Sequence, residues 1–313
     1  MTIQIISSVK DAAAYIEACL DSVRAQTHGD WHLTIRDDGS SDDTSKIIAR
    51  IADDEPRITL AYSGGDSIGA AAGFAWVLAQ IPINTEVVAC IDGDDLWRPT
   101  HLERSLETLR AAGAGPVLIH GDLEVVDTAL NTLHESFWAT LGLSPEPADL
   151  RRIAVANVVT GSTIVMNGAL AIILRNRATT GAAFQDSWFA LAAAAFGRIV
   201  ARRDITVRYR QHGTNSVGAR APRSARLLAL PRVAREAFDD RERFRRDLER
   251  TTTQAAGFLQ VFHDLLKPAD AQFLQRYAAI PQHDRLRRAL EVIWLRQYPG
   301  RSPLRALGEA LRA

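Results

Sequence analysis

The sequence is poor in cysteine and has no long apolar run. Only two of its 313 residues are cysteines, Cys19 and Cys90, and both lie in apolar patterns, so we expect neither a disulfide framework nor a cysteine metal site. No apolar run approaches the roughly 20 residues that a membrane span needs. No basic stretch precedes an apolar one at the amino terminus. We therefore expect a soluble, unprocessed protein of the reducing cytoplasm.

The sequence also lacks a glycine-rich turn after its first apolar run, Ile3–Ser8. A dinucleotide-dependent oxidoreductase would carry a G-x-G-x-x-G turn there to bind pyrophosphate. There is no internal repeat and no low-complexity tract. These absences argue against a cofactor-dependent dehydrogenase and against a solenoid protein.

The formal net charge is +0, but the charges are unevenly distributed. Residues 1–219 carry 18 basic and 26 acidic side chains, whereas residues 220–313 carry 19 and 11. The acidic part is typical of a site that holds cations. The basic tail is typical of a surface that meets an anionic partner such as a membrane face, and a solvated helical face explains it equally well.

Short β-rich runs alternate with helical patterns over the first 130 or so residues, and this alternation predicts an α/β fold with a mostly parallel sheet. Helical spacing of apolar residues predicts helices around Tyr15–Val23 and Thr100–Arg110. The predicted early strands are Ile3–Ser8, Trp31–Arg36, Ile58–Tyr62, Val87–Ile91 and Val117–His120. Further predictions are a strand at Val158–Met166, a helix at Phe184–Phe196 and one or two strands within Ile199–Arg210.

From Pro222 onward the sequence becomes Arg-rich, with apolar residues spaced by three and four. This pattern predicts a separate helical appendage. We therefore expect two parts, an α/β domain over residues 1–219 and a helical region over residues 220–313.

Acidic residues follow two of the predicted strands, where ligands of open α/β sheets bind. Asp37-Asp38-Gly39-Ser40 includes a turn and a helix cap, but these do not explain two carboxylates at a strand end. Asp92-Gly93-Asp94-Asp95 places three carboxylates in four residues, which repel one another unless a cation is present. Mg²⁺ and Mn²⁺ prefer such ligands and usually bridge to substrate phosphates, so we expect a metal-diphosphate site, with a plain polar turn as the alternative.

A third acidic feature is Gln185-Asp186-Ser187-Trp188, which opens an Ala-rich helix. Taken alone, Asp186 is explained by the favourable effect of a negative charge at a helix amino terminus. Beside the other two acidic sites, it becomes a candidate general base for deprotonating an attacking hydroxyl.

Five segments in order resemble glycosyltransferase family 2, with the GT-A fold, over roughly residues 1–220. They are LDSVRAQTHGDWHLTIRDDGSSDDTSKII, CIDGDDLWRPTHLE, LIHGDLEVVD, NVVTGSTIVMN and QDSWFALAAAAFGRIVARRDITVRYRQHGTNSVGA. The subgroup that the chain is most similar to contains bacterial rhamnosyltransferases of surface polysaccharide assembly. Where the family often has Arg or Asn after the third strand, this chain has Gly64-Gly65-Asp66-Ser67-Ile68-Gly69-Ala70.

The resemblance implies roles for individual residues in donor binding and catalysis. Asp38 matches the aspartate that binds the nucleoside, and Ser8 sits where the first strand approaches the base and ribose. Asp92 and Asp94 match the outer residues of the D-x-D motif, which binds the donor and Mn²⁺ or Mg²⁺, with Asp94 the better direct ligand. His212 matches a late polar motif near the metal and diphosphate.

Asp186 matches the catalytic base of the family, and the resemblance places four further residues on the acceptor side, Trp188, Trp97, Thr160 and Gly161. The implied reaction is an inverting transfer of a sugar from a dTDP-rhamnose or UDP-hexose donor to a glycan or lipid-linked acceptor. We expect no nucleic-acid partner. Dimer formation and peripheral contact of the C-terminal helices with the inner face of the cell membrane stay open.

Two alternatives from other classes also stay open. A nucleotidyltransferase couples paired carboxylates with Mg²⁺, but it usually needs a basic, glycine-rich loop for a triphosphate, and Ser7-Ser8-Val9-Lys10 is a poor one. A non-catalytic sugar-nucleotide-binding or scaffold protein need not keep carboxylates at all three acidic sites.

Overall fold

A seven-stranded sheet forms the centre of the molecule in the computed structural model, which describes residues 1–146, 148–213, 230–284 and 291. The strand order is β10-β6-β9-β4-β1-β2-β3, and β9 alone runs against its two neighbours. The strands are β1 (Ile3–Val9), β2 (Trp31–Asp37), β3 (Ile58–Tyr62), β4 (Val87–Cys90), β6 (Val117–Gly121), β9 (Val165–Asn167) and β10 (Arg198–Arg202). The prediction of an α/β fold with a mostly parallel sheet is confirmed.

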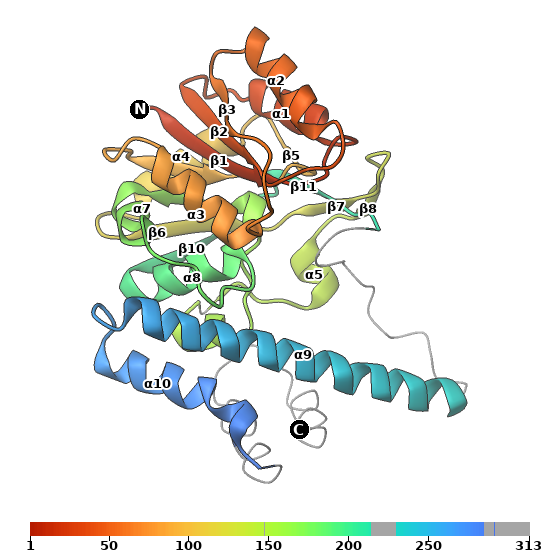
Figure 1. Cartoon of the computed structure of the whole chain (residues 1–313), viewed down its shortest axis with the longest axis vertical. Coiled ribbons are helices and arrows are strands. Elements are labelled where there is room, and N and C mark those ends of the chain that lie inside the picture. The colour runs from red at the N-terminus through yellow and green to blue at the C-terminus, as the bar shows by residue number, and fades with distance from the viewer. Residues whose placement is uncertain (147, 214–229, 285–290, 292–313) are drawn as a thin grey trace.

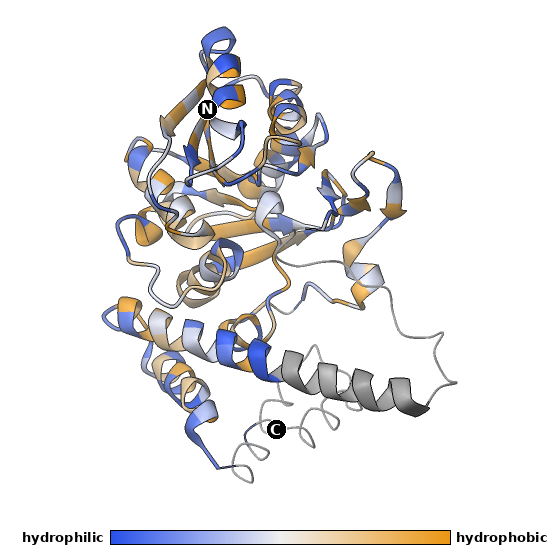
Figure 2. Cartoon of the chain, turned by 45° about the vertical axis from the view of Figure 1, so that its right-hand side comes forward, coloured by the Kyte–Doolittle hydropathy of each residue, from blue (hydrophilic) through white to orange (hydrophobic). Residues whose placement is uncertain are grey.

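Helices cover both faces of this sheet, because its strands are apolar on both sides. Ile5 of β1 belongs to one buried cluster and the next residue, Ile6, to the other. The first cluster includes residues of α1 (Ile16–Arg24), α2 (Thr44–Asp54) and α4 (His101–Ala111). The second includes residues of α3 (Ala70–Gln80), α6 (Leu150–Val155), α7 (Gly168–Leu174) and α8 (Gln185–Phe196). Colouring by hydropathy shows the apolar strands inside this layered arrangement (Figure 2).

A smaller sheet with the order β5-β11-β7-β8 lies beside the main one. Its strands are β5 (Leu96–Trp97), β7 (Glu124–Val126), β8 (Thr132–His134) and β11 (Val207–Arg210). The short helix α5 (Phe137–Leu141) follows β8. Because β5 comes directly after the turn that contains Asp94, the pairing of β5 with β11 brings the end of β11 close to that turn.

The C-terminal helices α9 (Leu230–Phe262) and α10 (Pro268–Ala278) run beneath the α/β layers, followed by the turn η2 (Ile280–Gln282) (Figure 1). Phe258 and Phe262 of α9 are fully buried, and their ring centroids lie 5.2 and 6.0 Å from that of Trp188 in α8. These helices share one hydrophobic core with the sheet. The prediction of helices at the C-terminus is confirmed, and the division of the chain into two domains stays a prediction. The predicted boundary at residues 219 and 220 lies outside the described residues.

Most predicted elements end within a residue or two of the observed ones, but Val158–Met166 is not a single strand. Residues Gly161–Thr163 form the 3-10 turn η1, and only Val165–Asn167 pair as β9. The prediction is wrong because the apolar residues before and after a turn are both buried in the core, so the sequence looks like one continuous strand. Along the described helices, none combines the length and the apolar character needed to cross a bilayer.

Candidate active site

The carboxyl ends of the parallel strands meet at one edge of the main sheet. Val9 at the end of β1 pairs in register with Asp37 at the end of β2, and Ile6 pairs with Cys90 at the end of β4. The backbone N–H of Asp38 donates to the Val9 carbonyl at 2.8 Å. A Cβ on Gly93 would lie 2.7 Å from Val9 Cγ1. The Asp38 turn and the Asp92–Asp95 turn therefore flank the same end of β1.

Asp92 is held by two elements that come later in the chain. Its backbone N–H donates to Ser162 Oγ at 3.0 Å, and the same hydroxyl donates to Asp92 Oδ2 at 3.1 Å. Gln185 Nε2 at the start of α8 donates to Asp92 Oδ1 at 3.1 Å. Burial, Asp94 and Asp186 raise the pKa of Asp92 to about 7, against the lowering effect of these two donors.

Gly161 lies directly against this carboxylate. A Cβ at Gly161 would be 2.7 Å from Asp92 Oδ2 and 2.8 Å from Gln185 Nε2, so a larger residue would displace both groups. The hydroxyl of Thr160 lies 3.2 Å from that of Thr163 within the same turn. The structure thus places Gly161 under Asp92, and an acceptor contact by Thr160 or Gly161 stays a prediction.

Asp94 and His212 lie side by side, as the predicted metal site requires. His212 Nε2 is 2.9 Å from Asp94 Oδ2, and the histidine ring stacks on Tyr15 with centroids 4.6 Å apart. The Arg210 side chain donates from Nε to the Asp94 carbonyl at 3.1 Å and lies over the same tyrosine ring. Tyr15 and Arg210 thus fix the two groups from α1 and β11.

Asp95 points inward from the same turn and is 2% exposed. It accepts a hydrogen bond from the Arg210 N–H at 3.1 Å. Burial, together with the negative charges of Asp94 and Asp92, raises the pKa of Asp95 well above its usual value. Three carboxyl groups thus lie close together in this turn, and Asp92 and Asp94 each disfavour the ionised form of Asp95.

Asp186 lies in the first turn of α8, and its negative charge acts on Asp92. It accepts hydrogen bonds from the backbone N–H and the hydroxyl of Ser187. Burial raises its pKa to about 6, and Arg250 of α9 acts in the opposite direction. Gln185, the residue before Asp186, donates to Asp92 Oδ1, so the start of α8 lies against the Asp92 turn. The role of Asp186 as a base stays a prediction.

Asp38 differs from these groups because both of its carboxylate oxygens accept hydrogen bonds from neighbouring residues. It accepts hydrogen bonds from Ser67 Oγ at 2.7 Å, from the N–H groups of Ile68 and Gly69 at 3.0 and 2.9 Å, and from Arg36 Nε at 3.1 Å. These donors lower its pKa despite its burial. In this conformation Asp38 holds the loop before α3, and its contact with a nucleoside stays a prediction.

Ser8 lies nearby on β1, and its hydroxyl has no hydrogen-bond partner among the residues the structure describes. It is covered by Gly73 of α3, where a Cβ would lie 2.0 Å from Ser8 Oγ. Its predicted contact with the base or ribose stays a prediction.

Two predicted acceptor residues are buried in the core. Trp188 is 1% exposed and packs on Phe258, and its assignment to the acceptor side stays a prediction. Trp97 is 3% exposed and donates from its ring N–H to the Ser162 carbonyl at 2.8 Å. Trp97 therefore supports the turn that holds Asp92, and its assignment to the acceptor side also stays a prediction.

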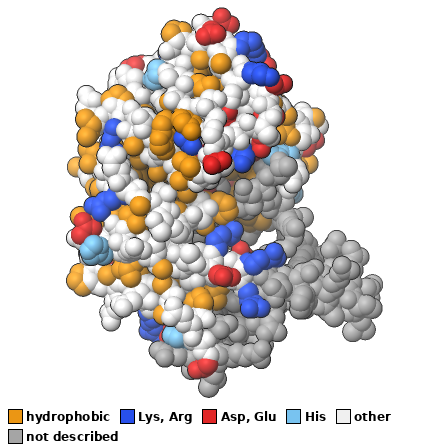
Figure 3. All heavy atoms as spheres, in the orientation of Figure 1, with side chains coloured by type: hydrophobic (Ala, Val, Ile, Leu, Met, Phe, Trp, Pro, Cys, Tyr) orange, Lys and Arg blue, Asp and Glu red, His pale blue; other side chains and the backbone are white. Residues whose placement is uncertain are grey.

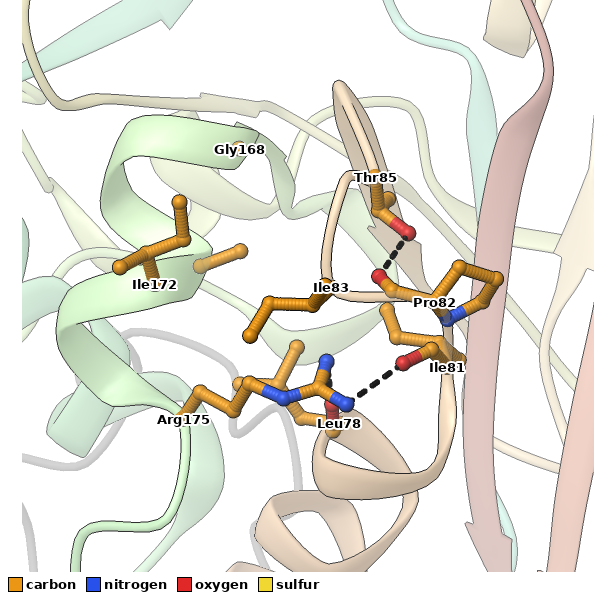
Figure 4. A pocket seen from close by; sticks show the side chains of 9 residues that line it. Leu78, Ile81, Pro82, Ile83, Thr85, Gly168, Ile172 and Arg175 are labelled. Atoms are coloured by element: carbon orange, nitrogen blue, oxygen red, sulfur yellow. Dashed lines mark hydrogen bonds between the residues drawn. The ribbon is translucent and has the colours of Figure 1, made fainter.

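A separate hollow lies at the opposite edge of the sheet (Figure 4). It is bordered by Thr85, which precedes β4, and by Gly168, which follows β9. Arg175 donates to the carbonyls of Leu78, Ala79 and Ile81 at 3.2, 2.6 and 2.7 Å, and so caps the end of α3. This hollow is a packing feature without the chemistry found near Asp92.

The carboxylate cluster fits a divalent cation by its donor chemistry. Asp92 and Asp94 offer hard oxygen ligands, with the His212 ring beside them, and Mg²⁺ and Mn²⁺ prefer oxygen ligands. Within the described part of the chain, no three His, Cys, Asp or Glu residues form a ready-made metal cage. An open site of this kind is completed by water and by substrate phosphates.

Comparisons with known proteins relate the chain to glycosyltransferases. Over 139 residues the chain is 32% identical to an uncharacterized glycosyltransferase of Nostoc sp., alr2836, covering 44% of this chain and 41% of that protein. Over 105 residues it is 33% identical to a Bacillus subtilis protein named for teichuronic acid biosynthesis, the glycosyltransferase TuaG, covering 34% and 40% of the two chains. The chain thus spans about two fifths of the length of these curated relatives.

Among solved structures, the chain is similar in fold to residues 1–349 of S. aureus TarS in complex with UDP-GlcNAc. The TM-score is 0.57 at 17% identity, covering 93% of this chain and 76% of that one. This likeness supports the GT-A fold. The family model described as glycosyl transferase family 2 matches residues 4–174, which is more than half of the chain. The chain therefore belongs to glycosyl transferase family 2.

Proposed function

We propose that this glycosyltransferase moves a sugar, with inversion at the anomeric carbon, from a nucleotide-diphosphate donor to a hydroxyl of a glycan or lipid-linked acceptor. The observation that carries the proposal is the contact between the start of α8 and the Asp92 turn, where Gln185, the residue before Asp186, donates from Nε2 to Asp92 Oδ1 at 3.1 Å. A base and a diphosphate site must lie this close together if the acceptor oxygen is to attack while the diphosphate leaves.

In the proposed reaction, the Asp186 carboxylate takes the proton of the acceptor hydroxyl as the oxygen forms a bond to the anomeric carbon. The bond between that carbon and the diphosphate oxygen breaks, and its electron pair leaves with the nucleoside diphosphate. Asp94, Asp92 and His212 would hold Mn²⁺ or Mg²⁺, which supplies compensation for the negative charge of the leaving diphosphate. Buried donors from Ser162 and Gln185 keep Asp92 in place throughout.

The proposed donors are dTDP-rhamnose and UDP-hexoses, and the proposed role is surface polysaccharide synthesis. Support for the role comes from TuaG, whose name refers to teichuronic acid biosynthesis. Support for a uridine donor comes from the UDP-GlcNAc bound to TarS. The sugar itself is selected by hydroxyl contacts, so a donor panel is the direct test.

The decisive experiment incubates the protein with UDP-GlcNAc, UDP-glucose, dTDP-rhamnose or GDP-mannose, each with and without Mn²⁺. Slow release of nucleoside diphosphate from one donor is the expected result. Release of pyrophosphate would instead indicate a nucleotidyltransferase, and binding without release would indicate a sugar-nucleotide-binding protein. Asp186→Asn should keep donor binding and lose roughly 10²–10⁴-fold in turnover, the usual contribution of a general base. Equal turnover in that variant would remove Asp186 from the mechanism.

We also propose that the protein works in the cytoplasm, with its C-terminal region resting on the inner face of the membrane. The support is the charge of residues 220–313, which carry 19 basic and 11 acidic side chains. Basic segments of this kind bind anionic lipid. Sedimentation with vesicles of phosphatidylglycerol and phosphatidylcholine should show binding that is lost at high salt. Equal recovery with pure phosphatidylcholine would contradict the membrane role.

A further inference from the structure

The loop that leads into the catalytic helix α8 rests directly on α9. A Cβ at Gly257 of α9 would lie 1.9 Å from the carbonyl oxygen of Thr180. Gly181 has a φ of +77°, and a Cβ there would lie 2.9 Å from the carbonyl oxygen of Thr253. The two backbones are thus in contact, and this approach requires glycine on both sides.

A buried amide extends the same contact toward Asp186. Gln254 is 2% exposed, and its Oε1 accepts a hydrogen bond from the backbone N–H of Ala183 at 3.1 Å. Ala183 lies three residues before Asp186, at the point where the loop becomes α8. A polar side chain buried at a helix contact is costly unless it is bonded, so this interaction fixes the loop position strongly.

Arg250 lies one turn earlier on α9, on the side that faces the site. Its guanidinium carbon is 5.1 Å from the ring centroid of Phe184, and its Nη2 is 2.7 Å from Asp247 Oδ1. Its positive charge favours the ionised form of Asp186. Lys and Arg side chains gather where α9 passes the α/β part of the molecule (Figure 3).

We propose that Arg250, Gln254 and Gly257 form a positioning face on α9 that holds the Asp186 carboxylate where it can take a proton from the acceptor. This inference rests on the proposed function, because it assumes that Asp186 is the base. It gives the C-terminal helix a part in catalysis, although α9 lies outside the residues that the family model matches.

The first test concerns position and needs no substrate. Gln254→Met keeps the side-chain volume and removes the acceptor of the Ala183 N–H. Gln260→Met is the matched control, because Gln260 is exposed on the same helix. Hydrogen exchange should be faster in the peptide that contains Ala183 for Gln254→Met alone, without a comparable rise in the peptide that contains the central strand β4, which separates local loosening from unfolding of the domain. Equal exchange in the two variants would overturn the proposed anchoring.

The second test concerns turnover, with whichever of the four nucleotide sugars is cleaved. Gln254→Met and Gly257→Ala should lower kcat by roughly 10- to 100-fold, the range expected for a misplaced catalytic group, with little change in KM for the donor. A rise in KM at constant kcat would overturn the proposal. If Asp186→Asn is inactive while the α9 variants are fully active, α9 has no positioning role and the proposed function stands. If Asp186→Asn is active, the proposed base is wrong and the positioning proposal falls with it.

The third test separates the charge of Arg250 from its packing. Among the residues that the structure describes, the charged groups that act on Asp186 are Asp92 beyond β4 and Arg250 on α9, and the Cys90 thiol is also affected by Asp186. Arg250→Gln should move the acid limb of the kcat profile to higher pH, and Arg250→Lys should restore it. Arg24→Gln is the control, since Arg24 has the same i,i+3 partner geometry with Asp21 and a similar exposure, 45% against 43%. An acid limb that does not move in Arg250→Gln would contradict the role of its charge.

Discussion

Two strand ends of one sheet hold carboxylates in opposite electrostatic situations. Beyond β2, Asp38 accepts hydrogen bonds from two backbone N–H groups and a hydroxyl and pairs with Arg36, and these contacts keep its pKa below the usual range. Beyond β4, burial and the neighbouring charges of Asp94 and Asp186 raise the pKa of Asp92 to about 7. The first carboxylate is compensated by the protein, whereas the second is not.

This difference separates a structural charge from a functional one. A carboxylate that is paired and hydrogen-bonded in the folded state stabilises that state, because these contacts favour its ionised form. An uncompensated group of carboxylates is costly to the fold and persists where a ligand supplies the missing positive charge. We therefore expect Asp38 to organise the loop over the donor site, and the Asp92–Asp95 turn with Asp186 to meet the cation and the reacting groups.

The largest effect on stability should come from removing the compensated charge. In Asp38→Asn one oxygen becomes an NH₂ group that faces backbone N–H donors, and Arg36 loses its buried partner. Breaking a buried ion pair in this way typically costs roughly 3–5 kcal/mol. Urea unfolding of the variant and of Asp43→Asn, whose exposed pair with Lys46 should contribute under about 1 kcal/mol, measures the difference. A loss no larger than that of Asp43→Asn would contradict the contrast.

The same substitution at the other strand end should act in the opposite direction. Asp92→Asn removes a negative charge from between Asp94 and Asp186 and can keep hydrogen bonds to Ser162 and Gln185. Without divalent cations, we expect the variant to be more stable by about 1–2 kcal/mol, a usual gain when a functional site is relieved of strain. Thermal unfolding with and without Mn²⁺ should also show a smaller cation-dependent rise than in the parent. Destabilisation in the absence of cations would show that Asp92 is compensated after all.

The pH dependence of turnover should depend on the ionisation of Asp186 and not on that of Asp38. Burial raises the pKa of Asp186 to about 6, and a general base must be ionised, so kcat should fall about tenfold per pH unit well below that value. The pKa of Asp38 is lowered, so Asp38 stays ionised throughout this window. Because the pKa of Asp92 is also raised, to about 7, the profile should be measured at saturating Mn²⁺, which would keep Asp92 ionised. A kcat profile between pH 5 and 8 should then show an acid limb from Asp186 that is absent from any residual activity of Asp186→Asn. A flat profile would place the base elsewhere.

The sequence was sufficient to predict the strands and the acidic strand ends, because burial and turn residues are local signals. It could not predict which side of α8 faces the core, because this helix is apolar nearly all round. The sequence therefore does not indicate whether Trp188 points into the core or toward the site. Nor could it predict that Phe258 of α9 packs on Trp188, a contact between residues 70 positions apart in the chain. The loop at Ser67–Gly69 was noted only as a departure from the family, because its hydrogen bonds to Asp38 depend on the tertiary fold.

The contacts of Asp92 beyond β4 could likewise not be predicted from the sequence. The segment around Ser162 resembles the family, but its apolar residues indicate a strand, so the sequence does not predict that the Ser162 hydroxyl holds Asp92. Gln185 and Arg210 were also missed, although each lies within two residues of a predicted site residue. Polar neighbours of a predicted site residue are therefore the signal that could have found them.

The smallest effect concerns the support of the compensated pair. The Arg36 guanidinium carbon lies 4.1 Å from the ring centroid of Tyr62, which is partly exposed. Tyr62→Leu removes this ring and should destabilise the fold by about 0.5–1 kcal/mol, the usual size of a cation–π contact near the surface. Tyr62→Phe keeps the ring and should be neutral. If both variants lose the same stability in urea unfolding, the hydroxyl and not the ring supports Arg36, and the compensation of Asp38 depends on its hydrogen bonds alone.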